Sequence, residues 1–123
     1  MKTEDLVLLP LTVYGTPSGN YDGSSDTDFS GDRQKAVAFY RRTTGTQSVL
    51  FNVDDFIGEI KIQATLDADP TQDAEWFDVY TFPDDSAATT ANVSVAIKGN
   101  FTWMRAKVTG FLGGAINNVL LTY

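Results

Sequence analysis

Apolar and polar residues alternate along residues 59–66, where Ile60, Ile62, Ala64 and Leu66 take every second position. A period of two places the apolar side chains on one face of an extended strand and the polar side chains on the other. The pattern therefore predicts a strand with one buried, apolar face and one solvent-exposed, polar face. Such a strand is typical of an antiparallel sheet.

The residues that follow predict a loop and a returning strand. Residues 67–73 are rich in aspartate and contain Pro70, which has no N–H to give to a neighbouring strand. Trp76–Phe82 is rich in aromatic and β-branched residues, so we expect the chain to return there as a strand. Shorter apolar runs of the same kind predict six more strands, at 5–14, 36–42, 47–53, 93–98, 101–109 and 116–123.

Turn-forming residues separate these runs. Asp54-Asp55 is expected to lie between two strands, Gly99-Asn100 to form a tight hairpin turn, and the glycines within 110–114 to form a flexible turn. Thr43–Thr46 is expected to form a further hairpin turn, and residues 87–91 are expected to form a small polar connector that could include one helical turn. Pro10 restricts the first run to an edge strand or to a strand with a bulge.

About eight short strands and no helix of typical length define the expected fold class. We predict an all-β protein, an antiparallel two-sheet β-sandwich resembling a jelly roll. At 123 residues and 42% hydrophobic content the chain is long enough for one core, so residues 1–123 are expected to form a single domain. Residues 15–32 consist almost entirely of turn-forming residues and predict a long acidic loop.

Net charge argues against two classes of partner. The formal charge is −7, and the nine basic residues are scattered along the chain. Nucleic acid and anionic membrane both require clustered Lys and Arg, so we expect neither as a partner. Glu4 and Asp5 precede the first apolar run and Pro10 interrupts it, so we expect no signal peptide, and no apolar run is long enough for a transmembrane segment.

The chain contains no histidine and no cysteine. This excludes a histidine-dependent triad, a cysteine nucleophile and the usual nitrogen and sulfur ligation of zinc or iron. Carboxylates are the remaining acid–base groups, and the glutamates Glu4, Glu59 and Glu75 are far apart in the expected strands and loops. We therefore predict that the protein is not an enzyme; a small carboxylate hydrolase would require Glu59 or Glu75 to converge with an aspartate in one pocket.

The acidic loop contains a partial calcium-binding pattern. Asp26, Asp28, Ser30 and Asp32 place oxygen atoms at alternate positions around a glycine, as at the start of a calcium loop. The position that should supply a bidentate glutamate is Val37, so the pattern is incomplete. Two interpretations remain: a calcium site of another type, assisted by Asn20 or Asp22, and a solvated loop in which Asp and Ser side chains cap turns.

Side chains in a strand alternate between two faces, and two tryptophans lie on the face of their strands that carries fewer apolar residues. Trp76 shares that face with Tyr80, and Trp103 shares it with Arg105. If the other face points to the core, these four residues form an outer aromatic surface with polar groups. Such a surface fits a protein interface or a platform on which sugar rings stack, and the remaining interpretation is that both faces of the sheet are buried and the rings belong to the core.

Three segments together resemble a known group of proteins. They are FNVDDFIGEIKIQATLDADPTQDAEWFDV from Phe51, GNFTWMRAKVTGF from Gly99 and INNVLLTY from Ile116. These segments resemble small virion structural proteins of tailed phages, especially the T4-like phages of marine cyanobacteria, over Phe51–Tyr123. The resemblance implies a β-sandwich subunit of the tail, fibre, neck or head decoration, with no catalytic residues.

The resemblance also implies partners and a location. We expect a homo-oligomer, with a trimer as the first expectation, that contacts other virion proteins and resides in the virion after synthesis in the host cytoplasm. Edge strands and outward aromatic rings agree with assembly, because subunit contacts would cover them. The alternative function is a carbohydrate-binding module, calcium-dependent if the acidic loop holds an ion.

Overall fold

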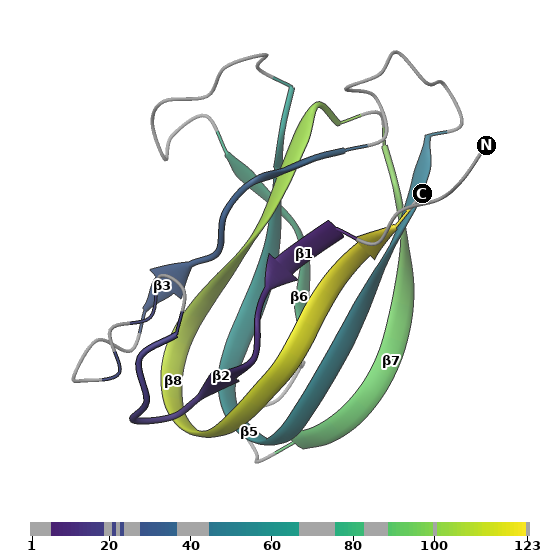
Figure 1. Cartoon of the computed structure of the whole chain (residues 1–123). Helices are drawn as coiled ribbons and strands as arrows, with labels where there is room; N and C mark the ends of the chain where they lie inside the picture. The colour runs from purple at the N-terminus through teal and green to yellow at the C-terminus, as the bar shows by residue number, and fades with distance from the viewer. Residues whose placement is uncertain are drawn as a thin grey trace.

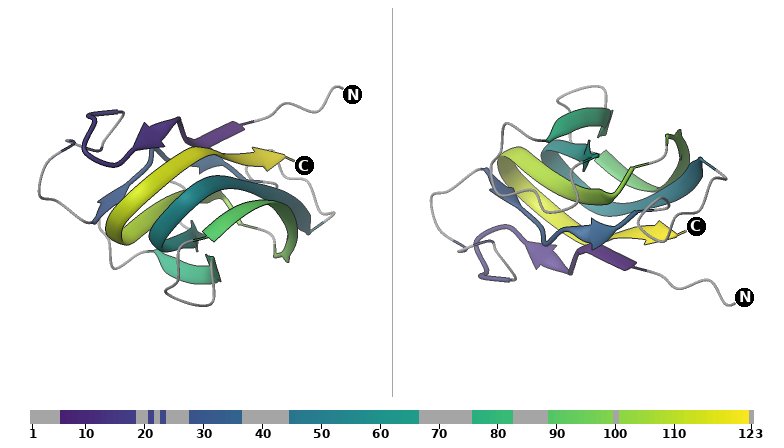
Figure 2. Two further views of the ribbon diagram at one scale, coloured as in Figure 1. Left: turned by 90° about the horizontal axis from the view of Figure 1, so that it is seen from below. Right: turned by 90° about the horizontal axis from the view of Figure 1, so that it is seen from above.

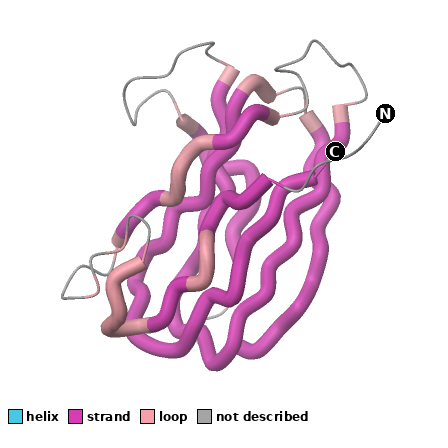
Figure 3. The backbone as a smooth tube through the Cα atoms, in the orientation of Figure 1, coloured by secondary structure: helices cyan, strands magenta, loops and turns pink. Residues whose placement is uncertain are grey.

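The described part of the chain is built from strands. The computed structural model describes residues 6–18, 21, 23, 28–36, 45–66, 76–82, 89–99 and 101–122, and no helix occurs among them (Figure 3). All strand pairs are antiparallel and belong to one sheet. The strands are β1 (Leu6–Leu9), β2 (Thr12–Val13), β3 (Phe29–Ser30), β4 (Gln34–Lys35), β5 (Thr46–Thr65), β6 (Phe77–Phe82), β7 (Thr89–Lys98) and β8 (Trp103–Thr122).

Two long strands, β5 and β8, form the middle of the sheet. They pair from Ser48 opposite Thr122 to Thr65 opposite Trp103. Both strands run down one side of the molecule, bend at the bottom of the view and run up the other side (Figure 1). Seen from below and from above, the bent strands divide the sheet into two halves that face each other (Figure 2).

The remaining strands pair with the outer edges of this central pair. On the free side of β5, β7 pairs with residues 46–56 and β6 pairs with residues 60–64. On the free side of β8, β3 and β4 pair with its first half, and β2 and β1 pair with its second half. One half of the sheet therefore contains β6 and the other contains β7, and each half includes part of both long strands.

The bend is made by irregular pairing between β5 and β8. The register shifts between Asp54 and Ile57 and again between Ile57 and Glu59, and Asp55 has a positive φ of 50°. Aspartate tolerates this left-handed conformation better than most residues. On β8, Gly114 has a φ of 80°, and a side chain there would clash with the backbone carbonyl of Asp55. Glycine thus permits the close approach of the two strands at the bend.

One hydrophobic core fills the space between the halves. Ile60, Ile62 and Ala64 on β5 are fully buried, as the alternation predicts, but Leu66 lies beyond the end of the strand and is 66% exposed. Phe51, from the half that contains β7, stacks on Phe82 of β6 with ring centroids 4.6 Å apart. The contact joins the two halves face to face across the core.

A second aromatic group fills the core at the bend. Phe111 is fully buried and lies 5.2 Å from Tyr21, 5.5 Å from Tyr14 and 5.7 Å from Phe56, measured between ring centroids. Tyr21 is also buried, and its hydroxyl accepts a hydrogen bond of 2.9 Å from the Gly15 N–H. The predicted acidic loop therefore contributes a core residue that its polar composition does not reveal.

The expected all-β, antiparallel fold is confirmed. The separate two-sheet, jelly-roll arrangement is not confirmed, because hydrogen bonds join all the described strands into one sheet. The predicted turn at the glycines within 110–114 is wrong, and so is the predicted break between strands at Asp54-Asp55, since both lie inside continuous strands. The predicted hairpin at Gly99-Asn100 is also wrong, because β7 pairs with β5 and not with β8.

Other local predictions have mixed outcomes. The strand interrupted at Pro10 is confirmed as β1 and β2, with a register shift between Val7 and Leu9. The predicted connector at 87–91 is wrong from Thr89 onward, where β7 begins. Residues 37–44 and 67–75, which include the predicted Thr43-Thr44 part of a turn and the proline loop, lie outside the described residues.

Candidate partner-binding face

The outer face of the half that contains β6 carries a row of polar side chains. On β5, Ile62 and Ala64 point into the core, so Gln63 between them points outward. The register places Gln63 opposite Asp78 of β6 on one side and opposite Arg105 of β8 on the other. The three side chains therefore lie side by side across three strands.

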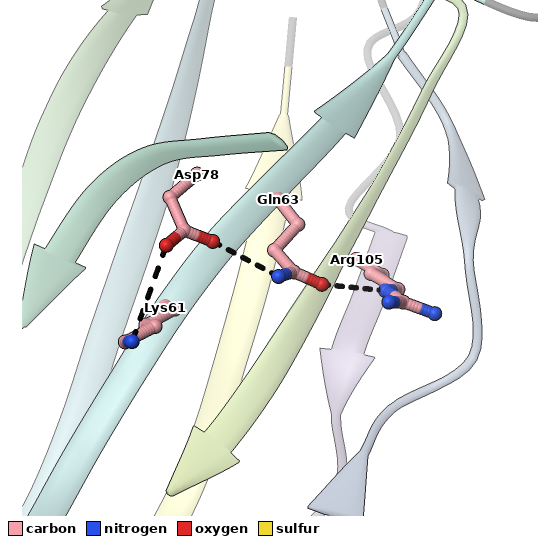
Figure 4. Close-up of polar contacts among 4 residues, drawn as sticks. All are labelled: Lys61, Gln63, Asp78 and Arg105. Carbon is pink, nitrogen blue, oxygen red and sulfur yellow. Dashed lines mark hydrogen bonds and ion pairs between the residues drawn. The ribbon is translucent and has the colours of Figure 1, made fainter. Parts of the chain in front are cut away.

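Hydrogen bonds join this row into a network (Figure 4). Gln63 Nε2 donates to Asp78 Oδ1 at 2.9 Å, and Gln63 Oε1 accepts from Arg105 Nε at 2.8 Å. Lys61 Nζ lies 4.0 Å from Asp78 Oδ2. The Gln63 amide thus presents its donor to an anion and its acceptor to a cation, which fixes its orientation.

Each tryptophan of this face is stacked by an arginine. Arg105 Cζ lies 4.5 Å from the centroid of the Trp76 ring, and Arg33 Cζ lies 4.3 Å from that of the Trp103 ring. Both geometries are those of cation–π contacts. Both indoles are half-buried, so neither belongs to the fully buried core. We call Trp76, Trp103, Arg33, Arg105 and the Gln63–Asp78 pair the Trp–Arg face.

Tyr80 does not lie with the tryptophans. The β5–β6 register shifts between Ile62 and Gln63, so that Ile62 faces Tyr80 whereas Gln63 faces Asp78. The extra residue, Val79, reverses the alternation, and Tyr80 packs against the core with its ring 5.8 Å from that of Phe51. Of the four residues predicted for an outer surface, the structure brings Trp76, Trp103 and Arg105 together there.

Three contributors to this face are not among the four residues predicted for it, although Asp78 shares the alternation of Trp76 in the sequence. Gln63 and Asp78 have the outward parity of their strands, so counting by two on neighbouring strands could have found them once the pairing was known. Gln63 is only 9% exposed although it points away from the core, which indicates that larger side chains cover it. Arg33 lies just after the predicted acidic loop, in the short connection between β3 and β4, and no periodic signal marks it.

The residues of the predicted calcium loop have separate contacts. Asp28 Oδ1 accepts a hydrogen bond of 3.0 Å from the Gly110 N–H, so this carboxylate holds the backbone of β8 near the bend. Ser30 lies opposite Lys107 in β3, and Asp32 is exposed. Asp26 lies outside the described residues. Within the described ranges, no group of three or more His, Cys, Asp or Glu residues could hold a metal ion.

The glutamates considered for a hydrolase lie away from the Trp–Arg face or outside the described residues. Glu59 is exposed and sits opposite Thr109 at the edge of the bend. Glu4 and Glu75 are not among the described residues. Of the three glutamates, the structure places only Glu59, and it lies outside the network that joins Gln63 to its neighbours.

Comparison with known proteins does not extend this description. Neither protein-family models, curated proteins nor solved structures give a match to the chain. In the part of the chain that the structure describes, there is no helix with the length and apolar character needed to cross a membrane.

The polar row gives a direct stability prediction. Gln63→Leu removes a hydrogen bond to a charged group on each side, and we expect it to lower the free energy of unfolding by about 1–3 kcal/mol. The control is Lys61→Ala, which removes a long, half-exposed ion pair and should cost no more than about 0.5 kcal/mol. Urea unfolding followed by tryptophan fluorescence measures both. Equal midpoints for the two variants would contradict the role assigned to Gln63.

Proposed function

We propose that this protein is a non-enzymatic structural or assembly subunit of a tailed-phage particle, in the tail, fibre, neck or head decoration. In this proposal, copies of the chain or other virion proteins bind the Trp–Arg face. The observation that carries the proposal is the presence of two half-buried indoles, each stacked by an arginine, around a hydrogen-bonded polar row. The resemblance over Phe51–Tyr123 supports the phage assignment.

The chemistry of the face supports binding to a protein. Tryptophan and arginine are enriched at protein interfaces, where they supply large apolar area together with hydrogen-bond donors. Stacking against Arg33 and Arg105 holds the rings in place before a partner binds, which lowers the entropy lost on association. Phe77, the residue after Trp76, is 42% exposed and packs edge-on against Phe101, but it lies opposite the inward-pointing Ala64 and so is not part of the Trp–Arg face.

The bent sheet supports a structural role in a second way. Its two halves enclose one core, and we propose that they act as the two layers of a sandwich-like subunit although hydrogen bonds connect them. Such an arrangement presents a broad outer face on each half. These outer faces are available for contacts between subunits.

The alternative proposal is a carbohydrate-binding module, and the half-exposed indoles are the observation in its favour. Sugars bind such modules by stacking on aromatic rings. Here a guanidinium already occupies one face of each indole, at 4.3 Å over Trp103 and 4.5 Å over Trp76. A sugar would have to use the opposite faces or displace the arginines, so the structural role is the better supported proposal.

Sedimentation velocity tests the structural role. We expect the wild-type protein to form oligomers at low micromolar concentration, and Trp103→Ala and Trp76→Ala to weaken them by at least tenfold, as for an interface residue that contributes about 1.4 kcal/mol or more. Leu11→Ala, which changes an exposed residue on the other half of the sheet, is the matched control and should leave the oligomers intact.

Two outcomes would contradict this expectation. Monomers at every concentration would remove self-assembly from the proposal. Binding of a glycan on an array, with loss of that binding in a folded Trp103→Ala variant, would favour the carbohydrate-binding alternative. Circular dichroism of each variant establishes that the fold survives the substitution.

A further inference from the structure

The two edges of the sheet differ in how they are covered. At the β1 edge, Gln34 Nε2 donates to the Val7 carbonyl at 2.9 Å, and a side chain at Gly31 would clash with the Leu8 carbonyl. The chain therefore covers its own edge at β1. At the opposite edge, β7 is the outermost strand in Figure 1, and among the described strands it pairs only with β5.

The exposed edge of β7 presents a regular row of backbone groups. Gly99 N donates to Gly45 O at 2.7 Å, and the β5–β7 register continues without a shift from Thr46 opposite Lys98 to Val53 opposite Ala91. In an antiparallel pair the hydrogen-bonding residues alternate, so the odd-numbered residues of β7 face β5. The N–H and C=O groups that point away from β5 belong to Asn92, Ser94, Ala96 and Lys98.

The side chains of β7 do not protect this edge. The strand contains no proline, and its single charged residue is Lys98 at the end. Asn92, Ser94 and Ala96 are small and exposed on the outer side. On the inner side Ile97 is buried but Val93 is 41% exposed, so the core is incompletely covered along this strand. Natural sheets usually block such an edge with charges, proline or a bulge.

The sequence of β7 is complementary to itself in antiparallel pairing. A two-fold axis through Ser94 aligns apolar residues with apolar residues on the inner side and small polar residues with small ones on the outer side. It also brings the outward backbone groups of one copy opposite those of the other. The resulting pairs are Ser94 with Ser94, Val93 with Val95, Asn92 with Ala96, Ala91 with Ile97 and Thr90 with Lys98.

Charge complementarity fixes the same register. Thr90 Oγ1 donates to Asp54 Oδ1 at 3.3 Å, so the Asp54 carboxylate lies on the outer side beside Thr90. In the register centred on Ser94, Lys98 of the second copy lies next to Thr90 and within reach of that carboxylate. The two-fold axis repeats this ion pair at the other end, and the two lysines are kept far apart.

We propose that two copies of the chain pair antiparallel through β7, with Ser94 opposite Ser94 and Lys98 of each copy paired with Asp54 of the other. The contact joins the two sheets into one continuous sheet and covers Val93. It deepens the structural role proposed above, on which it rests, by naming a second contact through which copies meet, apart from the Trp–Arg face. Because the contact is two-fold, it closes on two copies and not on the three expected from the resemblance.

Substitutions at Ser94 test the contact without disturbing the fold. Ser94→Pro removes an N–H that points away from β5 and places a ring where the second strand would lie, so the β5–β7 hydrogen bonds remain. Ser94→Ala keeps the N–H and is the matched control. By sedimentation velocity we expect dimers of the wild type and of Ser94→Ala, and loss of the dimer in Ser94→Pro. Circular dichroism establishes that Ser94→Pro is folded.

A charge exchange tests the register separately. Lys98→Asp should weaken the dimer about two- to tenfold, as for exposed ion pairs, and the double variant Lys98→Asp with Asp54→Lys should restore it. This arm decides the outcome if Ser94→Pro does not fold. Failure of the double variant to restore the dimer would overturn the register.

The outcomes separate this inference from the proposed function. If Trp103→Ala abolishes association whereas folded Ser94→Pro associates as the wild type does, the structural role survives and the β7 contact is wrong. If the wild-type protein is monomeric throughout the micromolar range, both self-assembly and the β7 contact are wrong. Loss of the dimer in Ser94→Pro alone would establish β7 as the contact.

Discussion

Gly114→Ala should lower the free energy of unfolding by at least about 3 kcal/mol, which places it among the most damaging single substitutions. A side chain at Gly114 would clash with the carbonyl of Asp55 and lie 2.6 Å from the carbonyl oxygen of Asp54. Both obstacles are backbone atoms of the neighbouring strand, so they cannot rotate aside. The bend would have to open, and urea unfolding measures the loss.

Gly110→Ala is the matched control for this prediction. Gly110 also has a positive φ, of 63°, but a side chain there would meet nothing within 4 Å. Gly110→Ala should therefore lower the free energy of unfolding only by the cost of a left-handed backbone conformation for alanine, about 1–2 kcal/mol. Equal unfolding midpoints for the two variants would mean that β5 and β8 do not approach closely at Gly114.

Phe111→Ala should destabilise the protein by about 3–5 kcal/mol, the usual cost of removing a fully buried phenylalanine. The centroid of its ring lies 5.2–6.0 Å from those of Tyr14, Tyr21, Phe29 and Phe56. Its loss would leave a cavity at the bend, where the backbone is already held by glycine and by bulges. Thermal and urea unfolding should both show the decrease.

The neighbouring residue provides the control for Phe111→Ala. Leu112 is 59% exposed, so Leu112→Ala removes little buried area and should change the free energy of unfolding by no more than about 0.5 kcal/mol. A loss of similar size in both variants would indicate that damage to the strand, and not loss of the core ring, is responsible.

Local alternation predicted the regular parts of the fold correctly. The buried face of residues 60–64 and the strand at Trp76–Phe82 follow from period-two patterns that need no knowledge of distant residues. The interruption at Pro10 follows from the missing N–H of proline. These features are determined within a few residues of sequence, which is why the sequence alone revealed them.

The bend could not be predicted in the same way. Aspartates and glycines that favour left-handed conformations occur both in tight turns and in bulges, so the local sequence predicts a break between strands at Asp54-Asp55 and a turn at the glycines near Gly114. Whether the chain reverses or continues there depends on the partner strand. β5 and β8 are far apart in the sequence, and nothing local to either strand reports their pairing.

The candidate site shows the same limit. The outward phase of Trp76, Trp103 and Arg105 followed from counting by two along single strands. One extra residue at Val79 was enough to turn Tyr80 to the core, and only the β5–β6 register reveals it. The stacking of Arg33 on Trp103 depends on the path of a loop, for which the sequence has no periodic signal.

The position of β8 in the sheet has a consequence for synthesis of the protein on the ribosome. Strands β1, β2, β3 and β4 pair only with β8 among the described strands, and β8 also forms the longest partner of β5. Residues 103–122 leave the ribosome after all of these strands. These early strands therefore stay unpaired in the nascent chain until residues 103–122 have been synthesised, and during this interval chaperones would protect them from aggregation.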